Sequence, residues 1–416
     1  MRLQSVLRLS LVAGLVAFAP SARADSASAL NSQMQGLKDQ VRALEEKIAA
    51  MDKPAAAPAA TESSPLTALT SGIQVSGFVD STFTHNFNSP DSKNNVGRVF
   101  DNDSNDFNLN AFEVVIQKPV SAESPVGFRA DIYAGEDAKL IHSAGLGSSD
   151  DSFDLQQGYA EFNLGLSKVS GLNDLDLKVG KFVTLAGAEV IEAKDNWNIS
   201  RSFGFGYAVP FAHTGVRSTY VFDNGWDMIL GVSNGWDNVD DSNSGKTFEA
   251  HLGLNSLKLP ADSSLTLLFN GYVGPELADN NSSQRWLGDF VATYKTPWKP
   301  LTLMYNFDYA KQEDALGSGS DAAWYAHAAY FRYDIDADWS VSGRGEYFKD
   351  EDGYRIVSGT PANYREFTAT LEYRPWSGVI ARLEYRNDHA NHAVFDDDSG
   401  TSKSQDTLAG EVIVAF

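Results

Sequence analysis

Apolar and polar side chains alternate along the chain from Ile73 to its end. In the first run, Ile73 and Val75 share one face and Asp80 lies on the other. A period of two is typical of β-strands with one apolar and one polar face. Sixteen such runs begin near residues 73, 105, 126, 153, 175, 212, 225, 246, 264, 284, 300, 321, 338, 363, 379 and 404. In the second run the parity changes between Leu109 and Phe112, which predicts a β-bulge.

The connections between these runs differ in length. Short turns follow Phe222, Thr296, Ile335 and Arg374, whereas longer links rich in Asp, Asn, Ser and Gly lie between them. Short turns at one end and long loops at the other are typical of outer-membrane barrels, as is a girdle of aromatic residues at the membrane interface. Aromatic residues gather beside the short turns: Phe222, Trp226, Tyr294, Trp298, Trp339, Tyr373 and Trp376. We predict an all-β membrane protein, a sixteen-stranded antiparallel outer-membrane β-barrel over residues 72–416.

One long segment, residues 184–212, interrupts the alternation. It contains Glu189, Glu192 and Asp195 together with several aromatic residues. A loop of this length in a compact protein is usually functional or disordered, and this one is too apolar for a flexible linker. By strand order it is the third external loop, and we expect it to fold into the barrel and narrow the pore. An ordinary external loop packed on its neighbours is the alternative.

Charged side chains on the inward face supply the candidate functional residues. A sixteen-stranded barrel keeps an aqueous channel, in which charged arcs can set ion preference. The alternation turns these residues inward: Asp80, Arg129, Asp131, Arg217, Glu249, Asp289, Asp308, Arg344, Glu346, Glu372, Arg382, Glu384, Arg386 and Glu411. We predict a pore constriction in which the loop acids face a basic wall, formed by Glu189, Glu192, Asp195, Arg217, Arg344, Arg382 and Arg386. The excess of acids favours cations slightly.

A second interpretation of the same charges is purely structural. The inward charges could simply pair with each other across strands, with Arg344–Glu346 and Arg382–Glu384 as the neighbours, and solvate the wall. The sequence leaves both interpretations open, because charged residues in a barrel lumen commonly serve both purposes.

Three segments precede the barrel. Residues 1–24 combine Arg2 and Arg8, an apolar run and a small-x-small end, which predicts a cleaved secretory signal. Residues 54–71 are rich in Pro, Ala, Ser and Thr and predict an extended linker. Residues 25–53 predict a periplasmic coiled coil, or alternatively a single surface helix, because apolar residues repeat at heptad spacing: Leu30, Met34, Leu37, Val41, Leu44, Ile48 and Met51.

Composition removes several classes of function. The chain has no cysteine, which excludes disulfides and thiolate chemistry, and its formal net charge of −22 argues against binding to nucleic acid. The histidines show no metal-ligand spacing, and Asp101–Asp106 lacks the glycine and the final glutamate of a calcium loop. No catalytic arrangement is evident. We therefore expect neither an enzyme nor a resident metal or cofactor.

Several short strings resemble the OmpL-like family of β-barrel porins. They are GFVD at 77–80, GKF at 180–182, NIS at 198–200, PFAHTGVR at 210–217 and NGWD at 234–237. The resemblance implies a channel-forming outer-membrane protein, and likeness to general porins implies a homotrimer with its third loop in the lumen. The heptad segment resembles that of phosphate-selective porins, but the acid excess speaks against phosphate selectivity. The terminal Phe416 resembles the signal read by the barrel assembly machinery of Gram-negative bacteria.

Together these features predict a porin that lets ions and small hydrophilic solutes diffuse passively across the outer membrane. Its partners would be outer-membrane lipid, the assembly machinery and the solutes themselves. The rival hypothesis is a structural protein, in which the coiled coil and the linker reach the cell wall and the barrel serves as a membrane anchor.

Overall fold

The computed structural model describes residues 72–121, 123–165, 172–317 and 319–416. The signal, coiled-coil and linker predictions for residues 1–71 lie outside this described part. Residues 72–416 form one compact unit. No helix in the described part of the chain is long and apolar enough to cross a membrane.

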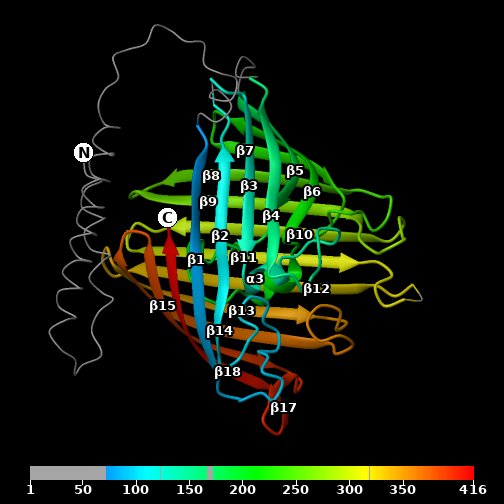
Figure 1. Ribbon diagram of the computed structural model, residues 1–416, viewed down its shortest axis with the longest axis vertical. Coiled ribbons are helices and arrows are strands. Elements are labelled where there is room, and N and C mark those ends of the chain that lie inside the picture. Colours follow the sequence, from blue (N-terminus) through cyan, green and yellow to red (C-terminus); the bar gives the residue numbers. More distant parts are fainter. Residues whose placement is uncertain (1–71, 122, 166–171, 318) are drawn as a thin grey trace, which may run out of the picture. The chain divides into compact units, whose positions relative to one another are not determined.

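Sixteen antiparallel strands close into a barrel (Figure 1). Each strand pairs with its neighbours along the chain, and β1 pairs with β18 to complete the circle. The barrel strands are β1 Gln74–Asn86, β2 Asp106–Lys118, β3 Val126–Ala134, β4 Phe153–Asn163, β5 Leu172–Val183, β6 Ala212–Phe222, β7 Trp226–Ser233, β8 Thr247–Leu259, β9 Ser263–Pro275, β10 Gln284–Lys295, β11 Leu301–Gln312, β12 Ala322–Asp334, β13 Trp339–Asp350, β14 Ala362–Trp376, β15 Val379–Ala390 and β18 Ser404–Ala415.

Short elements occupy the loops. They are α3 Glu136–Leu140, the 3-10 turn η1 Ala193–Asp195, the π-turn η2 Gly204–Ala208, and the hairpin β16 Phe395–Asp397 with β17 Gly400–Ser402. The sixteen predicted strands are all present in the predicted order, and the sixteen-stranded antiparallel barrel is confirmed. The largest difference is at β5, which begins at Leu172, slightly before the expected start.

The predicted bulge in the second strand is also present. Asp80 on β1 pairs with Ala111, and the next residue of β1 pairs with Leu109, so Asn110 has no partner of its own in the ladder. Asn110 and Ala111 are consecutive and both buried, whereas Leu109 and Phe112 on either side are exposed. A bulge of this kind reverses the parity of the strand beyond it.

The two faces of the barrel follow the alternation. Large apolar side chains such as Phe248, Leu383 and Val412 are exposed on the outer face. Of the fourteen charged residues predicted to face inward, thirteen are buried, and the side chain of Arg129 is 29% exposed. Because a buried charge is costly unless it is paired, this interior must be organised by ion pairs and hydrogen bonds.

Exposed aromatic rings collect near the short turns, as the sequence predicts. Trp298 and Trp376 are 60% and 73% exposed, and Trp339 stacks on Tyr373 with ring centroids 4.3 Å apart. At the same end the last residue, Phe416, exchanges two backbone hydrogen bonds of 3.0 Å with Gly77 on β1. The end of the chain therefore continues the closing ladder between β1 and β18 (Figure 1).

Candidate functional site

The segment 184–211, between β5 and β6, lies against the inner wall of the barrel. Glu384 on β15 accepts hydrogen bonds from the backbone N–H groups of Ile199, at 2.6 Å, and Ser200, at 2.9 Å. Glu346 on β13 accepts two further N–H groups of the segment, at 2.7 and 2.6 Å. Both glutamates face inward and are buried. The wall carboxylates thus satisfy main-chain donors that have no strand partner.

Three of the predicted arginines hold the same segment. Arg344 contacts the carboxylate of Glu189 at 2.6 Å, which joins the wall directly to a loop acid. Arg382 donates to two backbone carbonyls of the segment, at 3.0 and 2.7 Å, and Arg386 donates to one at 2.6 Å. All three arginine side chains are no more than 1% exposed. They lie between the wall and the segment and fasten one to the other.

Arg382 pairs across strands, but with acids other than the predicted Glu384. Its guanidinium contacts Glu372 on β14 at 2.8 Å and Glu411 on β18 at 2.9 Å, and both residues stand directly opposite it in the ladders. It does not pair with Glu384, its neighbour along the strand. Opposite side chains on adjacent strands are closer together than residues two apart on one strand, and Glu384 is already engaged by the segment.

Arg344 also pairs across strands, but with a diagonal neighbour, because Thr368 stands directly opposite it. Its Nε atom contacts Glu366 on β14 at 2.7 Å, whereas Glu346 on its own strand accepts loop N–H groups instead. The two named pairs, Arg344–Glu346 and Arg382–Glu384, are therefore not formed, whereas both arginines do pair with acids across strands.

The remaining predicted constriction residues lie apart from this network. Arg217 on β6 forms a bidentate ion pair with Glu249, at 2.6 and 2.9 Å, and its guanidinium lies 4.0 Å from the ring centroid of Phe182. Asp195 pairs with Lys194 at 2.5 Å, and its side chain is 55% exposed. Arg217 therefore pairs with a wall acid on β8, across the intervening strand β7, rather than with the loop acids.

Apolar contacts complete the attachment of the segment. Phe203 packs against Phe348 on β13 and Tyr364 on β14, with ring centroids 6.4 and 5.2 Å apart. The indole N–H of Trp324 donates to the carbonyl of Ala208 at 3.3 Å. The aromatic residues of the segment are thus part of the interior, in keeping with the expectation that it is too apolar to be a floppy linker.

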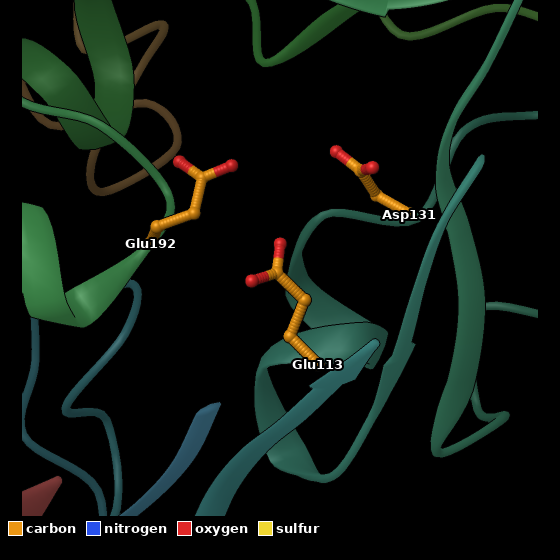
Figure 2. Close-up of side chains that lie close together, drawn as sticks. All are labelled: Glu113, Asp131 and Glu192. Carbon is orange, nitrogen blue, oxygen red and sulfur yellow. The ribbon is translucent and has the colours of Figure 1, made fainter. Parts of the chain in front are cut away.

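Glu192, on the same segment, lies beside two acids of the opposite wall (Figure 2). One carboxylate oxygen from each of Glu113 on β2, Asp131 on β3 and Glu192 lies within 4.8 Å of the others. Burial raises the pKa of the Glu192 carboxyl above its usual range. We call these three residues the acidic triad.

Glu192 and Asp131 are among the residues predicted from the sequence, but Glu113 is not. Beyond the bulge of β2, Phe112 and Val114 alternate with Ala111, Glu113 and Val115, so the corrected parity already turns Glu113 inward. That these three carboxylates lie close together could not be predicted from the sequence, because the residues are far apart in the chain.

Residues 72–416 match the family described as "Putative beta-barrel porin-2, OmpL-like". The chain belongs to this family. Membership supports an outer-membrane channel rather than an enzyme, and it confirms the resemblance found in the sequence. No curated protein matches the sequence of this porin.

Solved structures resemble the porin across most of its length. The anion-selective porin from Comamonas acidovorans shares 10% identity and a TM-score of 0.54, over 83% of this chain and 99% of that one. OprB of Pseudomonas putida shares 8% sequence identity with a TM-score of 0.54, and the match covers 85% of this chain and 96% of that one. The trimer form of OmpT from Vibrio cholerae shares 8% sequence identity with a TM-score of 0.52, and the match covers 83% of this chain and 99% of that one. At such low identity the likeness shows the shared barrel fold alone.

Proposed function

We propose that this OmpL-like porin is a passive diffusion channel of the outer membrane for ions and small hydrophilic solutes, narrowed by the segment 184–212. The observation that carries the proposal is the attachment of that segment to inward-facing residues of β13, β14 and β15. A segment fastened at so many points occupies part of the lumen permanently rather than covering its mouth.

The exposure of the inner wall indicates where solutes pass. On the wall that binds the segment, the side chains of Arg344 and Arg382 are fully buried. On the facing strands, the inward side chains of Arg129, Lys178 and Glu161 remain 29%, 28% and 18% exposed. We place the solute path between the segment and β3–β5, the part of the lumen where charged groups still meet water.

A polar depression near the short turns lies on the other side of the segment, against β12–β14. It has a volume of about 530 Å³ and is lined by Lys194 and Asp195 of the segment together with Arg332, Glu372 and Arg374 of the wall. Charges of both signs on such a surface favour small polar solutes and disfavour apolar ones.

Single-channel recording of the purified protein in a planar bilayer tests the proposal. Stepwise conductance is the expected result, and grouped steps would support the homotrimer that the trimer form of the structurally similar OmpT suggests. A folded, heat-modifiable barrel that never conducts would contradict the diffusion channel. That outcome would favour the structural anchor, whose coiled coil at 25–53 and linker lie outside the described residues, and cell-wall pulldown with residues 25–71 would test it.

We also propose that the last strand presents the assembly signal. Phe416 is 60% exposed and lies in phase with Leu408, Val412 and Val414, which are exposed on the same outer face. An apolar outward face ending in an aromatic ring is available to lipid and to the barrel assembly machinery. The backbone hydrogen bonds between Phe416 and Gly77 form only when the barrel closes.

A further inference from the structure

The acidic triad joins the inner wall to the inward segment. Glu113 and Asp131 come from adjacent strands, where Asp131 pairs with Val115 and so lies diagonally across the ladder from Glu113. Glu192 approaches from the segment, one residue before η1. Figure 2 shows the three carboxylates pointing into one shared space.

Glu113 lacks any partner that would explain its burial. The residue is 1% exposed, and neither oxygen of its carboxylate accepts a hydrogen bond from the residues that the structure describes. Arg129, on the adjacent strand, donates instead to Asp131 at 2.8 Å. An unpaired carboxylate buried beside two other acids is strongly destabilising. Its charge must therefore be neutralised by a bound cation or removed by protonation.

Two glutamines hold the other acids in position. A register shift between β3 and β4 places Asp131 opposite Gln157 and leaves Gln156 as an extra residue, so both glutamines are buried in the interior. Gln157 donates to Asp131 at 2.5 Å, and Gln156 donates to Glu192 at 3.0 Å. Hydrogen bonds of this kind orient the ligands of metal sites.

The spacing of the carboxylates suits calcium. Calcium takes oxygen ligands at about 2.3–2.6 Å, so two ligands on opposite sides of one ion lie about 5 Å apart. Oxygens that lie within 4.8 Å of one another can therefore share a single calcium ion. Magnesium needs shorter bonds and near-octahedral geometry, which makes it the poorer fit.

We propose that Glu113, Asp131 and Glu192 bind one divalent cation, with calcium as the best fit. The ion would attach the segment to β2 and β3, on the side of the lumen opposite the arginines that hold it to β13–β15. It would also neutralise part of the charge beside the solute path. The proposal concerns binding and does not depend on conduction.

Calorimetric titration of the chelator-treated full-length protein with calcium chloride tests the site directly. We expect saturable binding, and we expect Glu113→Gln to weaken it by about tenfold or more because one ligand loses its charge. The matched control is Glu161→Gln, which removes an inward-facing carboxylate that pairs with Lys178 at 3.4 Å, outside the triad. Its calcium affinity should equal that of the parent protein.

A second variant guards against a folding defect. If Glu113→Gln fails to fold, Glu192→Gln changes the ligand on the segment without altering a barrel strand, and it should show the same loss. Calcium should also raise the unfolding temperature of the parent but not of either triad variant, because a ligand that binds only the folded state stabilises it.

Two results would overturn the site. One is the absence of calcium binding at neutral pH, which would mean that a proton neutralises Glu113. The other is binding that is as strong in Glu113→Gln and Glu192→Gln as in the parent. Neither result depends on channel recording, so a protein that binds calcium but does not conduct would contradict the diffusion channel while supporting the site.

Discussion

At the scale of single residues, buried carboxylates replace missing strand partners. A main-chain N–H buried without an acceptor is costly, and the segment 184–211 has no neighbouring strand to provide one. Glu384 and Glu346 accept two N–H groups each, as the oxygens of a strand backbone otherwise would. Hydrogen bonds to a charged acceptor are also stronger than those between neutral groups.

Replacing Glu384 tests this role. Glu384→Gln removes the charge and one acceptor oxygen, so the amides of Ile199 and Ser200 should lose about 1.5–3 kcal/mol of protection. Hydrogen exchange at these two amides should accelerate about tenfold or more. Glu161→Gln serves as the control and should leave both rates unchanged. Equal exchange in the two variants would contradict the anchoring role of Glu384.

Asp137 in α3 gives the porin a predictable pH dependence. Burial raises the pKa of this carboxyl from 3.8 to about 8, an effect that Arg201 opposes and that Glu411, Asp101 and Glu136 reinforce. The folded state therefore keeps a proton that the unfolded state loses near pH 4. Stability from this group is fully present below about pH 4 and is lost as the pH rises toward 8.

Asp137→Asn should remove this contribution to the pH dependence. We expect the variant to melt at a higher temperature than the parent at pH 9, because each unit of raised pKa corresponds to about 1.4 kcal/mol. Near pH 4 the two should melt alike. Asp338→Asn, in an exposed turn, is the control. If the melting temperature falls between pH 4 and pH 9 by the same amount in Asp137→Asn as in the parent, the assignment to Asp137 is wrong.

At the scale of elements, bulges decide which side chains enter the lumen. In β2 the bulge makes Asn110 and Ala111 face inward in succession, and in β4 a similar shift buries Gln156 beside Gln157. A slip of one residue moves every later side chain of a strand to the other face. These two irregularities therefore place Glu113 and the glutamines that support the acidic triad.

Single-residue deletions in β2 should distinguish the bulge from the regular strand. Deleting Asn110 restores strict alternation, so the barrel should still assemble. Deleting Asn108 instead turns Phe107, which is 82% exposed on the outer face, toward the interior. We expect a several-fold lower yield of heat-modifiable barrel for this second deletion. Similar yields for both would contradict the bulge as the determinant of parity.

At the scale of the whole molecule, the barrel has two unlike sides. One wall is buried beneath the segment 184–211, whereas the wall of β3–β5 keeps partly exposed charges. Two acids of the segment lie on different sides of it. Glu189 forms an ion pair with Arg344, whereas Glu192 faces Glu113 and Asp131 on the opposite wall. The preference of the pore for cations should therefore depend on Glu192 more than on Glu189.

The double variant Glu189→Gln with Glu192→Gln should lower cation preference, measured as a reversal potential in a salt gradient. Loss of a negative charge beside the path weakens attraction for cations. Glu192→Gln alone should account for most of the shift. Asp398→Asn, in an exposed loop, is the control for a distant charge. Unchanged selectivity in the double variant would remove the segment from ion discrimination.

Much of the barrel could be predicted from the sequence, but its contacts could not. Alternation located all sixteen strands and fourteen of the lumen-facing charges, because side chains on a strand point to opposite faces in turn. The pairing of Arg382 with Glu411 was missed, because it depends on the register between β15 and β18. Glu113 was also missed, although the predicted bulge before it already turns its side chain inward.

The sequence by itself determined the strand order, the outward apolar face and the long apolar segment between the fifth and sixth strands. A barrel in lipid must bond every backbone group between strands and present apolar side chains to the bilayer, and both demands leave a local pattern in the chain. Only the tertiary structure decided which wall holds the segment and which acids meet across the lumen. Glu113, Asp131 and Glu192 come together through register and barrel closure, which join residues far apart in the chain and leave no spacing to read.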